Sequence, residues 1–174
     1  MIDAIVYYSR HGSTKKYAEA CAELLNVKCF SLDKAKKELK KNSSIIFFSS
    51  VKGAKLRKYG KVEGRYDIKM VCAVGILPKT ILTIENIKNE NIIYKPIIYL
   101  RGELDYNKLS FFEKRYLIMF RKNIAKYLEV YYDTAIDEDE ALSILSKEKS
   151  SFYNEDDLLV IKKYFGNENN DYVS

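Results

Sequence analysis

Apolar and polar positions alternate along this chain in blocks that predict strands and helices in turn. Apolar runs with β-branched and aromatic members predict buried strands. These runs are residues 2–8, 27–32, 43–48, 69–77 and 95–100. Apolar residues at helical spacing predict helices, and the polar segment 33–40 is predicted as a helix with Asp33 as its N-cap. These helices are residues 14–25, 33–40, 81–89, 110–128 and 155–165.

Polar capping residues predict where several helices begin. Asp33 and Asn154 are predicted N-caps, and Ser110 with Glu113 three residues later predicts a capping box. The acidic run 137–140 suits the start of a further helix. Residues 49–67 are rich in Gly and Lys and predict a long loop, with at most a short helix near 55–59. With no repeat and no linker, we expect one domain over residues 1–165 and a polar tail over 166–174.

Alternating strands and helices predict an α/β fold, a doubly wound five-stranded parallel sheet with helices on both faces. The pattern alone leaves the strand order open. In such sheets ligands bind at the carboxyl ends of the strands. The chemistry is therefore expected after Tyr8, Phe48, Leu77 and Leu100.

A hydroxyl-rich loop joins the first strand to the first helix, and it predicts a phosphate site. Free N–H groups and the dipole at a helix start favour an anion, and Gly12 permits close backbone approach. GxxxxGK[ST] and GxGxxG are both absent, which disfavours P-loop and Rossmann dinucleotide sites. The alternative is that the loop only caps the helix, with His11 as a bystander. The candidate residues are Ser9, Arg10, His11, Gly12, Ser13 and Thr14.

The charge distribution and the cysteine spacing bear on the ligand of this site and on the compartment of the protein. The net charge is +6, and residues 1–75 hold 16 Lys and Arg against 7 Asp and Glu, which fits a basic field around an anionic ligand. The alternative, which holds for most individual lysines, is a lysine-rich solvated surface. Three cysteines without CxxC spacing predict buried thiols rather than a disulfide or zinc site, as in a reducing cytoplasm. No apolar run is long enough to cross a bilayer, and the N-terminus is not expected to be a signal peptide.

The segment from Ile5 to Ala18 resembles the opening of flavodoxins, whose [ST]-x-T-G-x-T loop grips the phosphate of FMN. Ser9, Gly12 and Thr14 match that motif, while His11 stands where flavodoxins usually have Thr. Residues 99–110, followed by an aromatic and basic helix, resemble the flavodoxin-domain branch that includes menaquinone-dependent protoporphyrinogen dehydrogenase. The resemblance spans residues 2 to about 165 and implies strand order 2-1-3-4-5 with bound FMN.

The resemblance also implies loops for the flavin ring after the third and fourth strands. Residues 49–55 are similar to a ring loop that often reads S-x-[IV]-[YR]-x-G-K. Lys52 replaces the frequent aromatic, and Gly53-Ala54 reverses the usual order; Tyr59, Tyr66 or Tyr106 could compensate. The ring candidates are Ser49, Ser50, Val51, Lys52, Gly53, Ala54, Gly75, Ile76 and Leu77.

The helix at 110–128 carries an apolar stripe flanked by basic residues. We expect this stripe, Phe112, Tyr116, Phe120, Ile124 and Tyr127, to pack on the sheet. The alternative is a surface for a quinone, a membrane or a carboxylated tetrapyrrole, with basic residues 52, 55, 57, 58, 61 and 65 forming an anionic-substrate mouth.

The sequence therefore predicts a cytoplasmic FMN-dependent redox protein. Its expected partners are FMN and either a redox protein or a small acceptor such as a quinone, and a peripheral membrane contact is a further possibility. No side chain is assigned as catalytic and no metal is expected. The alternative is a flavodoxin-like module that has lost FMN and serves in binding or regulation. Nucleic-acid binding by the basic half is not expected, because no reading motif is recognised.

Overall fold

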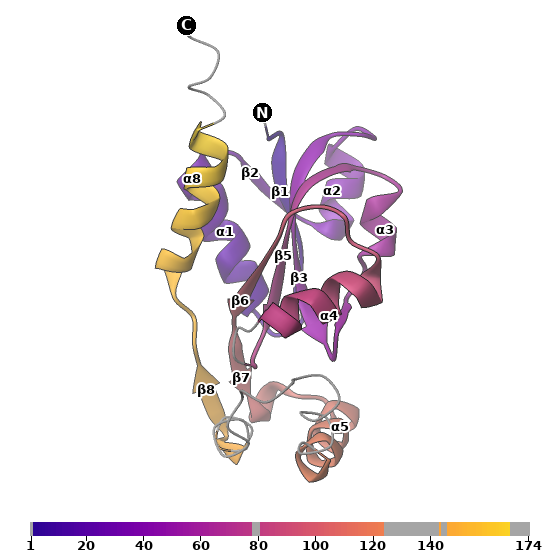
Figure 1. The fold of residues 1–174 in the computed structure, drawn as a ribbon, viewed down its shortest axis with the longest axis vertical. Coiled ribbons are helices and arrows are strands. Elements are labelled where there is room, and N and C mark those ends of the chain that lie inside the picture. Colours follow the sequence, from indigo (N-terminus) through magenta and orange to yellow (C-terminus); the bar gives the residue numbers. More distant parts are fainter. Residues whose placement is uncertain (1, 78–80, 124–142, 144–145, 168–174) are drawn as a thin grey trace, which may run out of the picture.

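The computed structural model describes residues 2–77, 81–123, 143 and 146–167. Its central sheet runs in the order β2-β1-β3-β5-β6, with every neighbouring pair parallel (Figure 1). The strands are β1 (Ala4–Tyr8), β2 (Lys28–Ser31), β3 (Ser44–Lys52), β5 (Asp67–Gly75) and β6 (Ile97–Arg101). The predicted α/β class and the order 2-1-3-4-5 are confirmed.

Helices cover both faces of this sheet. On one side lie α1 (Ser13–Leu25) and α8 (Leu159–Asn167). On the other lie α2 (Leu32–Glu38), α3 (Gly60–Glu63) and α4 (Ile81–Asn91) (Figure 1). Pro96 directly precedes the edge strand β6, where a missing N–H costs no ladder bond.

The core consists of two layers, because successive strand residues point to opposite faces. In β3, Phe47 packs with the α2–α4 layer and Phe48 with the α1–α8 layer, and both are completely buried. Cys21 and Cys72 are also buried, and burial raises the pKa of the Cys21 thiol to about 12. These two thiols pack as small apolar side chains.

The predicted loop over residues 49–67 is wrong. β3 continues to Lys52 and turns back as β4 (Lys55–Leu56), and the short helix α3 follows. The two-residue turn needs a positive φ at its first position, and Gly53 supplies it with φ 61°. The Gly53-Ala54 order thus fits a tight hairpin. The polar, lysine-rich composition of this segment gave no strand pattern, since a two-residue edge strand needs no apolar face.

Two further elements depart from the sequence prediction. Helix α2 begins one residue earlier than expected, and its N-cap is Ser31, whose hydroxyl accepts from the N–H of Lys34; Asp33 lies in the first turn. Beyond β6, the strands β7 (Glu103–Asp105) and β8 (Lys149–Ser151) form an antiparallel pair that was not predicted. Each has three residues, too few for a period-2 pattern to be recognised.

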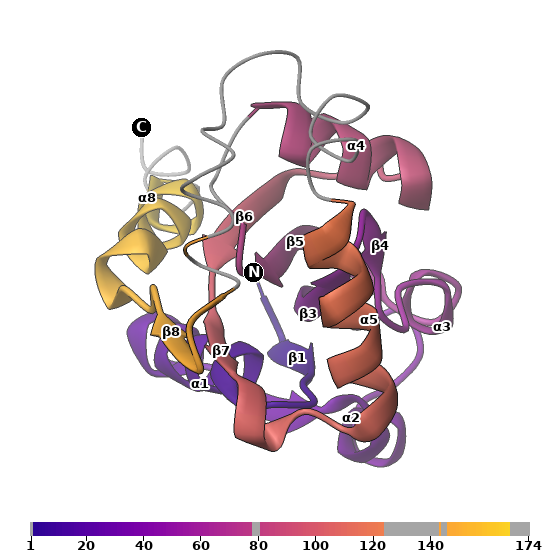
Figure 2. The same cartoon turned by 90° about the horizontal axis from the view of Figure 1, so that it is seen from below.

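Helix α5 (Phe111–Lys122) lies at the carboxyl end of the sheet rather than on one of its faces (Figures 1 and 2). Its predicted capping box between Ser110 and Glu113 is confirmed. The predicted continuation over 124–128 lies outside the described residues, as do the acidic run 137–140 and the tail from residue 168. Within the described residues, no helix combines the length and apolar character needed to cross a membrane.

The end of the chain returns to the face that α1 covers. Asn154 caps the 3₁₀ turn η2 (Glu155–Leu158) by accepting from the N–H of Asp156, as predicted, and α8 follows. The buried Tyr17 hydroxyl donates to the carbonyl of Arg101 at 2.8 Å and accepts from the N–H of Asn154 at 3.0 Å. This one side chain therefore fixes α1 against the carboxyl end of β6, beside the loop predicted to bind phosphate (residues 9–14, here called the phosphate loop).

Candidate functional site

Two adjoining cavities lie at the carboxyl end of the sheet, where the fold predicts a ligand. One, of about 140 Å³, lies against the loop before α1; the other, of about 190 Å³, lies beneath α5. Five residues line both: His11, Val51, Gly75, Ile76 and Leu104. Small-molecule sites usually measure about 300–1,000 Å³, so the two cavities together reach only the low end of that range.

The loop before α1 forms the polar end of this space. Gly12 has φ 109°, a conformation that favours glycine, and its N–H donates to the Ser9 hydroxyl at 3.2 Å. Helix α1 begins without a side-chain cap, although Ser13 and Thr14 are both buried in its first turn. An uncapped helix start beside a cavity offers N–H groups and a positive dipole end to an anion.

Two further features of the smaller cavity suit a polar ligand. The buried Ser50 hydroxyl at the end of β3 has no hydrogen-bond partner within the described part of the chain. Gly102 brings β6 close to α1, because a Cβ at this position would lie 2.9 Å from the Ser13 hydroxyl. A buried hydroxyl without a partner is costly, so this space favours an occupant that can hydrogen-bond.

The larger cavity has mainly apolar walls. Val51 and Gly53 from the β3–β4 hairpin lie on one side, and Ile76 and Leu77 after β5 lie on another. Gly75 is required where β5 ends, because a Cβ there would overlap the hydroxyl of Tyr99. That hydroxyl donates to the Leu77 carbonyl at 3.1 Å and holds the loop after β5 in place.

Helix α5 supplies the aromatic wall that the hairpin lacks. Tyr116, Leu117 and Phe120 line the larger cavity, and the Lys52 ammonium lies 4.6 Å from the centroid of the Tyr116 ring. The suggested substitutes do not line it: Tyr59 and Tyr66 are buried in the core, and Tyr106 lies in the turn before α5. The prediction that Phe112 packs on the sheet is wrong, since it is 79% exposed.

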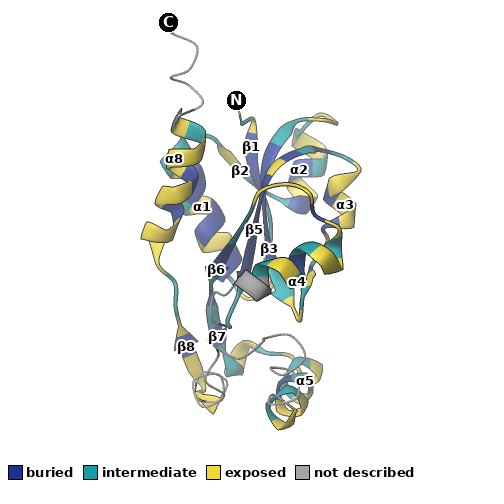
Figure 3. Cartoon of the chain, viewed as in Figure 1, coloured by how far each residue is buried: buried dark blue, intermediate teal, exposed yellow. Residues whose placement is uncertain are grey.

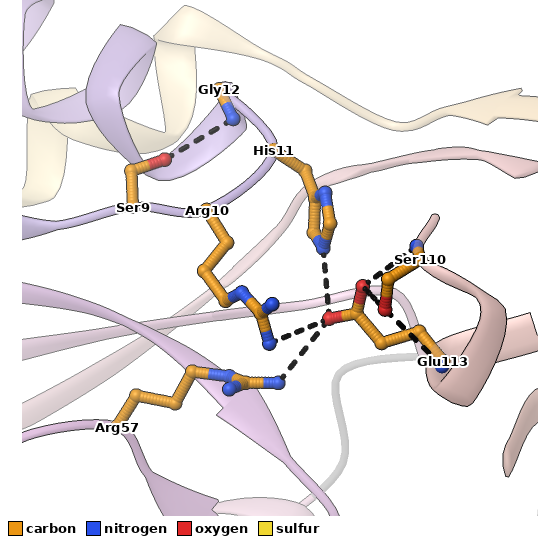
Figure 4. A network of polar contacts seen from close by, with 7 residues as sticks. All are labelled: Ser9, Arg10, His11, Gly12, Arg57, Ser110 and Glu113. Atoms are coloured by element: carbon orange, nitrogen blue, oxygen red, sulfur yellow. Dashed lines mark hydrogen bonds and ion pairs between the residues drawn. The ribbon is translucent and has the colours of Figure 1, made fainter. Parts of the chain in front are cut away.

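Three basic side chains converge on one carboxylate at the junction of the cavities (Figure 4). The Glu113 Oε1 atom lies 2.8 Å from Arg10 Nη1, 3.2 Å from His11 Nε2 and 3.8 Å from Arg57 Nη2. Burial acts to raise the pKa of Glu113, but hydrogen bonds from the Ser110 backbone and hydroxyl, then His11, outweigh it and lower the pKa to about 2. The carboxylate is therefore charged throughout the physiological range.

Most of the predicted site residues line the cavities. These are Arg10, His11, Ser13, Thr14, Ser50, Val51, Lys52, Gly53, Gly75, Ile76 and Leu77. Four others act beside the cavities. Ser9 and Gly12 shape the loop, Ser49 donates its hydroxyl to the Arg57 carbonyl at 2.6 Å, and the Ala54 carbonyl accepts from Asn91 Nδ2 at 2.8 Å.

The basic residues proposed to form one mouth are divided among several places. Lys52 and Arg57 line the larger cavity. Lys55 pairs with Glu90, the Lys58 ammonium lies over the ring of Tyr8, and Arg65 donates to the Lys36 carbonyl. The structure thus brings together a smaller cationic group than the sequence suggested.

Sequence reasoning did not assign several side chains that line the larger cavity. They are Tyr99, Leu104, Leu109, Glu113 and Leu117, whereas Tyr116 and Phe120 were named in the alternative of a surface for a quinone, a membrane or a tetrapyrrole. The capping-box motif placed Glu113 in the first turn of α5, but it carries no information on a partner 102 residues away. Only the position of α5 at the carboxyl end of the sheet brings Glu113 and His11 together (Figure 1).

The comparison with protein families agrees with this geometry. Residues 4–62, which run from β1 into α3 and include the phosphate loop, match a family model described as a flavodoxin domain. No curated protein matches the chain. The resemblance to the protoporphyrinogen dehydrogenase branch stays a prediction. The matched segment and the strand order together support a flavodoxin-like α/β fold.

Proposed function

We propose that this chain is an FMN-binding redox protein that transfers electrons or hydride. The observation that carries the proposal is the pair of adjoining cavities. One end meets the uncapped start of α1, and the other is enclosed by apolar side chains. In FMN, a charged phosphate and a flat aromatic ring lie at opposite ends of a polar chain, which matches that division. When bound, FMN would supply the redox chemistry, while the protein supplies binding and electrostatics.

The donor set fits the phosphate and the chain that follows it. The N–H groups of the first turn of α1, with the hydroxyls of Ser13 and Thr14, would hold the phosphate. The Ser50 hydroxyl, buried without a partner among described residues, would receive a hydrogen bond from the polar chain between phosphate and ring.

The ring would lie between the hairpin, the loop after β5 and α5. Leu77 and Tyr116 would exclude water from it, and the Lys52 ammonium would favour a negatively charged ring. Each of these residues binds or orients the group. None is assigned the role of acid or base.

An FMN titration of the apo-protein, followed by flavin fluorescence, tests the proposal. Wild type should bind saturably, and Gly12→Asp should abolish binding, because a carboxylate and a Cβ at φ 109° enter the phosphate loop. Gly64→Asp is the matched control, since Gly64 has an ordinary φ of −78° with open space around its Cα and lies at the end of α3. It should bind like wild type. Absence of wild-type binding at high micromolar FMN would refute the proposal.

The proposal extends to an acceptor that approaches from the α5 side, such as a quinone or a porphyrinogen. The outer face of α5 exposes Phe111, Phe112, Ile118 and Met119 beside Arg115 and Lys122. Large apolar side chains with flanking cations suit a peripheral contact with an anionic membrane. Vesicles containing anionic lipid should co-sediment wild type, and Phe112→Asp should weaken this; equal partition would refute the contact.

A second candidate is a flavodoxin-shaped binding module without FMN. The observation that favours it is the Glu113 carboxylate, which already neutralises part of the cationic group beside the cavity. The FMN titration separates the two candidates. A colourless protein that fails to bind FMN yet unfolds cooperatively would favour the module.

A further inference from the structure

Glu113 divides its two carboxylate oxygens between two tasks. Oε2 accepts from the Ser110 N–H at 3.1 Å and from the Ser110 hydroxyl at 2.8 Å, which completes the capping box of α5. Oε1 faces Arg10, His11 and Arg57 (Figure 4). A capping box forms with Gln as well as with Glu. The helix therefore does not need the negative charge, whereas the three basic side chains do.

The four side chains together retain positive charge. Arg10 and Arg57 each carry a positive guanidinium group, so the single carboxylate of Glu113 cannot neutralise them both. Arg10 belongs to the phosphate loop, and Arg57 follows β4. Guanidinium groups held by separate elements around one oxygen are the arrangement that recognises a carboxylate or a phosphate.

Helix α5 has few other attachments to the sheet. Leu117 is its one buried side chain among the described residues, and its other residues are exposed or half-buried (Figure 3). Tyr116 adds the contact with the Lys52 ammonium. The ion pairs of Glu113 therefore carry much of the attachment of α5 over the larger cavity.

We propose that Arg10, His11 and Arg57 form a binding site for the carboxylate or phosphate of a ligand with an apolar body, and that Glu113 occupies this site until the ligand replaces it. The apolar body of the ligand would enter the larger cavity against Tyr116, Leu117 and Phe120. Replacement of Glu113 would free α5 from the phosphate loop. The proposal does not depend on FMN.

Calorimetric titration with benzoate, a flat carboxylate, tests the site on the full chain. Glu113→Gln keeps the capping box but removes the competing charge, so benzoate should bind about tenfold more tightly than to wild type. Glu19→Gln is the matched control, because it removes the same charge from a pair with Lys15 on α1. Its affinity should stay within about twofold of wild type. Arg57→Gln added to Glu113→Gln should reverse the gain.

Amide hydrogen exchange of α5 tests the replacement itself. Exchange in Glu113→Gln should be about tenfold faster than in wild type, and saturating benzoate should bring wild type toward that rate. Equal benzoate affinity in wild type and Glu113→Gln would overturn the proposal, as would an equal gain in Glu19→Gln. Slower exchange of α5 on binding to wild type would also overturn it.

Titration with FMN distinguishes the two possible sources of the anion, which are FMN itself and a substrate. If FMN provides it, saturating FMN should abolish benzoate binding to Glu113→Gln. If a substrate provides it, benzoate should bind the FMN-saturated protein as tightly as before. A chain that fails to bind FMN but shows the gain with benzoate would refute the proposed redox function and support this site.

Discussion

The sheet body and the α5 cover are held together by different forces. In the body, β1, β3 and β5 are buried on both faces, and Phe47 and Phe48 are completely enclosed. In the cover, α5 buries Leu117 alone among its described residues and depends on ion pairs and a cation–π contact. Apolar burial gives the body a stable frame, while the cover has weaker, charge-dependent contacts. The proposed binding site between them would combine rigid walls from the body with a helix that can detach.

The largest expected effect comes from removing an aromatic ring from the body. Phe47→Ala should lower the free energy of unfolding by about 3–5 kcal/mol, because it empties a completely buried position. Leu117→Ala in the cover should lower it by no more than about 1 kcal/mol, since α5 can detach before the body unfolds. Urea denaturation measures both. A comparable loss for the two variants would show that α5 belongs to the cooperative core.

The same contrast explains what the sequence could predict. Strands such as β1 and β3 were recognised because burial on both faces leaves an apolar run. The sequence of α5 carries no comparable signal. Phe112 and Tyr116 lie on the same predicted apolar stripe, yet Phe112 is exposed and Tyr116 lines the cavity. The stripe indicated an amphipathic helix but not what it would meet.

Local chemistry was also more predictable than distant pairing. The loop predicted to bind phosphate was identified from Ser9, Gly12 and Thr14, because a strand, a short loop and a helix start lie within one segment. The partnership of His11 with Glu113 spans 102 residues and depends on where the chain turns after β6. The β3–β4 hairpin was missed for another reason. It consists of a tight turn at Gly53 and a strand of two residues, which is too short to give a recognisable pattern.

A smaller effect is expected within the body, where the chain after β6 packs against α1 and β5. Gly102→Ala should destabilise the protein by about 1–3 kcal/mol, because the new Cβ would lie 2.9 Å from the Ser13 hydroxyl and 3.0 Å from Val74. The strain should also displace the start of α1 and weaken FMN binding. Gly64→Ala, with open space around its Cα, provides the control in both measurements. Unchanged stability in Gly102→Ala would mean that α1 and β6 can separate freely.

Acid should weaken the cover through Glu113. Its pKa is about 2 in the folded protein against an ordinary value of 4.5, so its stabilisation is complete above pH 4.5 and is lost as the pH falls toward 2. The opening free energy of α5, from hydrogen exchange, should fall by about 1–2 kcal/mol over this window.

Glu113→Gln should remove most of that pH dependence from α5. Asp67, whose pKa is lowered chiefly by its hydrogen bond from Lys69, would continue to titrate in the body of both proteins. An unchanged acid response of α5 in Glu113→Gln would show that other carboxylates hold the cover.

The smallest expected effect compares one cation–π pair in each region. The Lys52 ammonium lies 4.6 Å from the Tyr116 ring in the cover, and the Lys34 ammonium lies 5.7 Å from the Phe30 ring in the body. A double-mutant cycle with Lys52→Met and Tyr116→Leu should give a coupling of about 0.5–1 kcal/mol in the opening of α5, with none in global unfolding.

The corresponding cycle with Lys34→Met and Phe30→Leu should show its coupling in global unfolding, because Phe30 packs in the core. It should leave the exchange of α5 unchanged. If the Lys52–Tyr116 coupling appeared in global unfolding instead, the cover and the body would open together. A ligand could then reach the larger cavity only through the hairpin or the loop after β5, and not by release of α5.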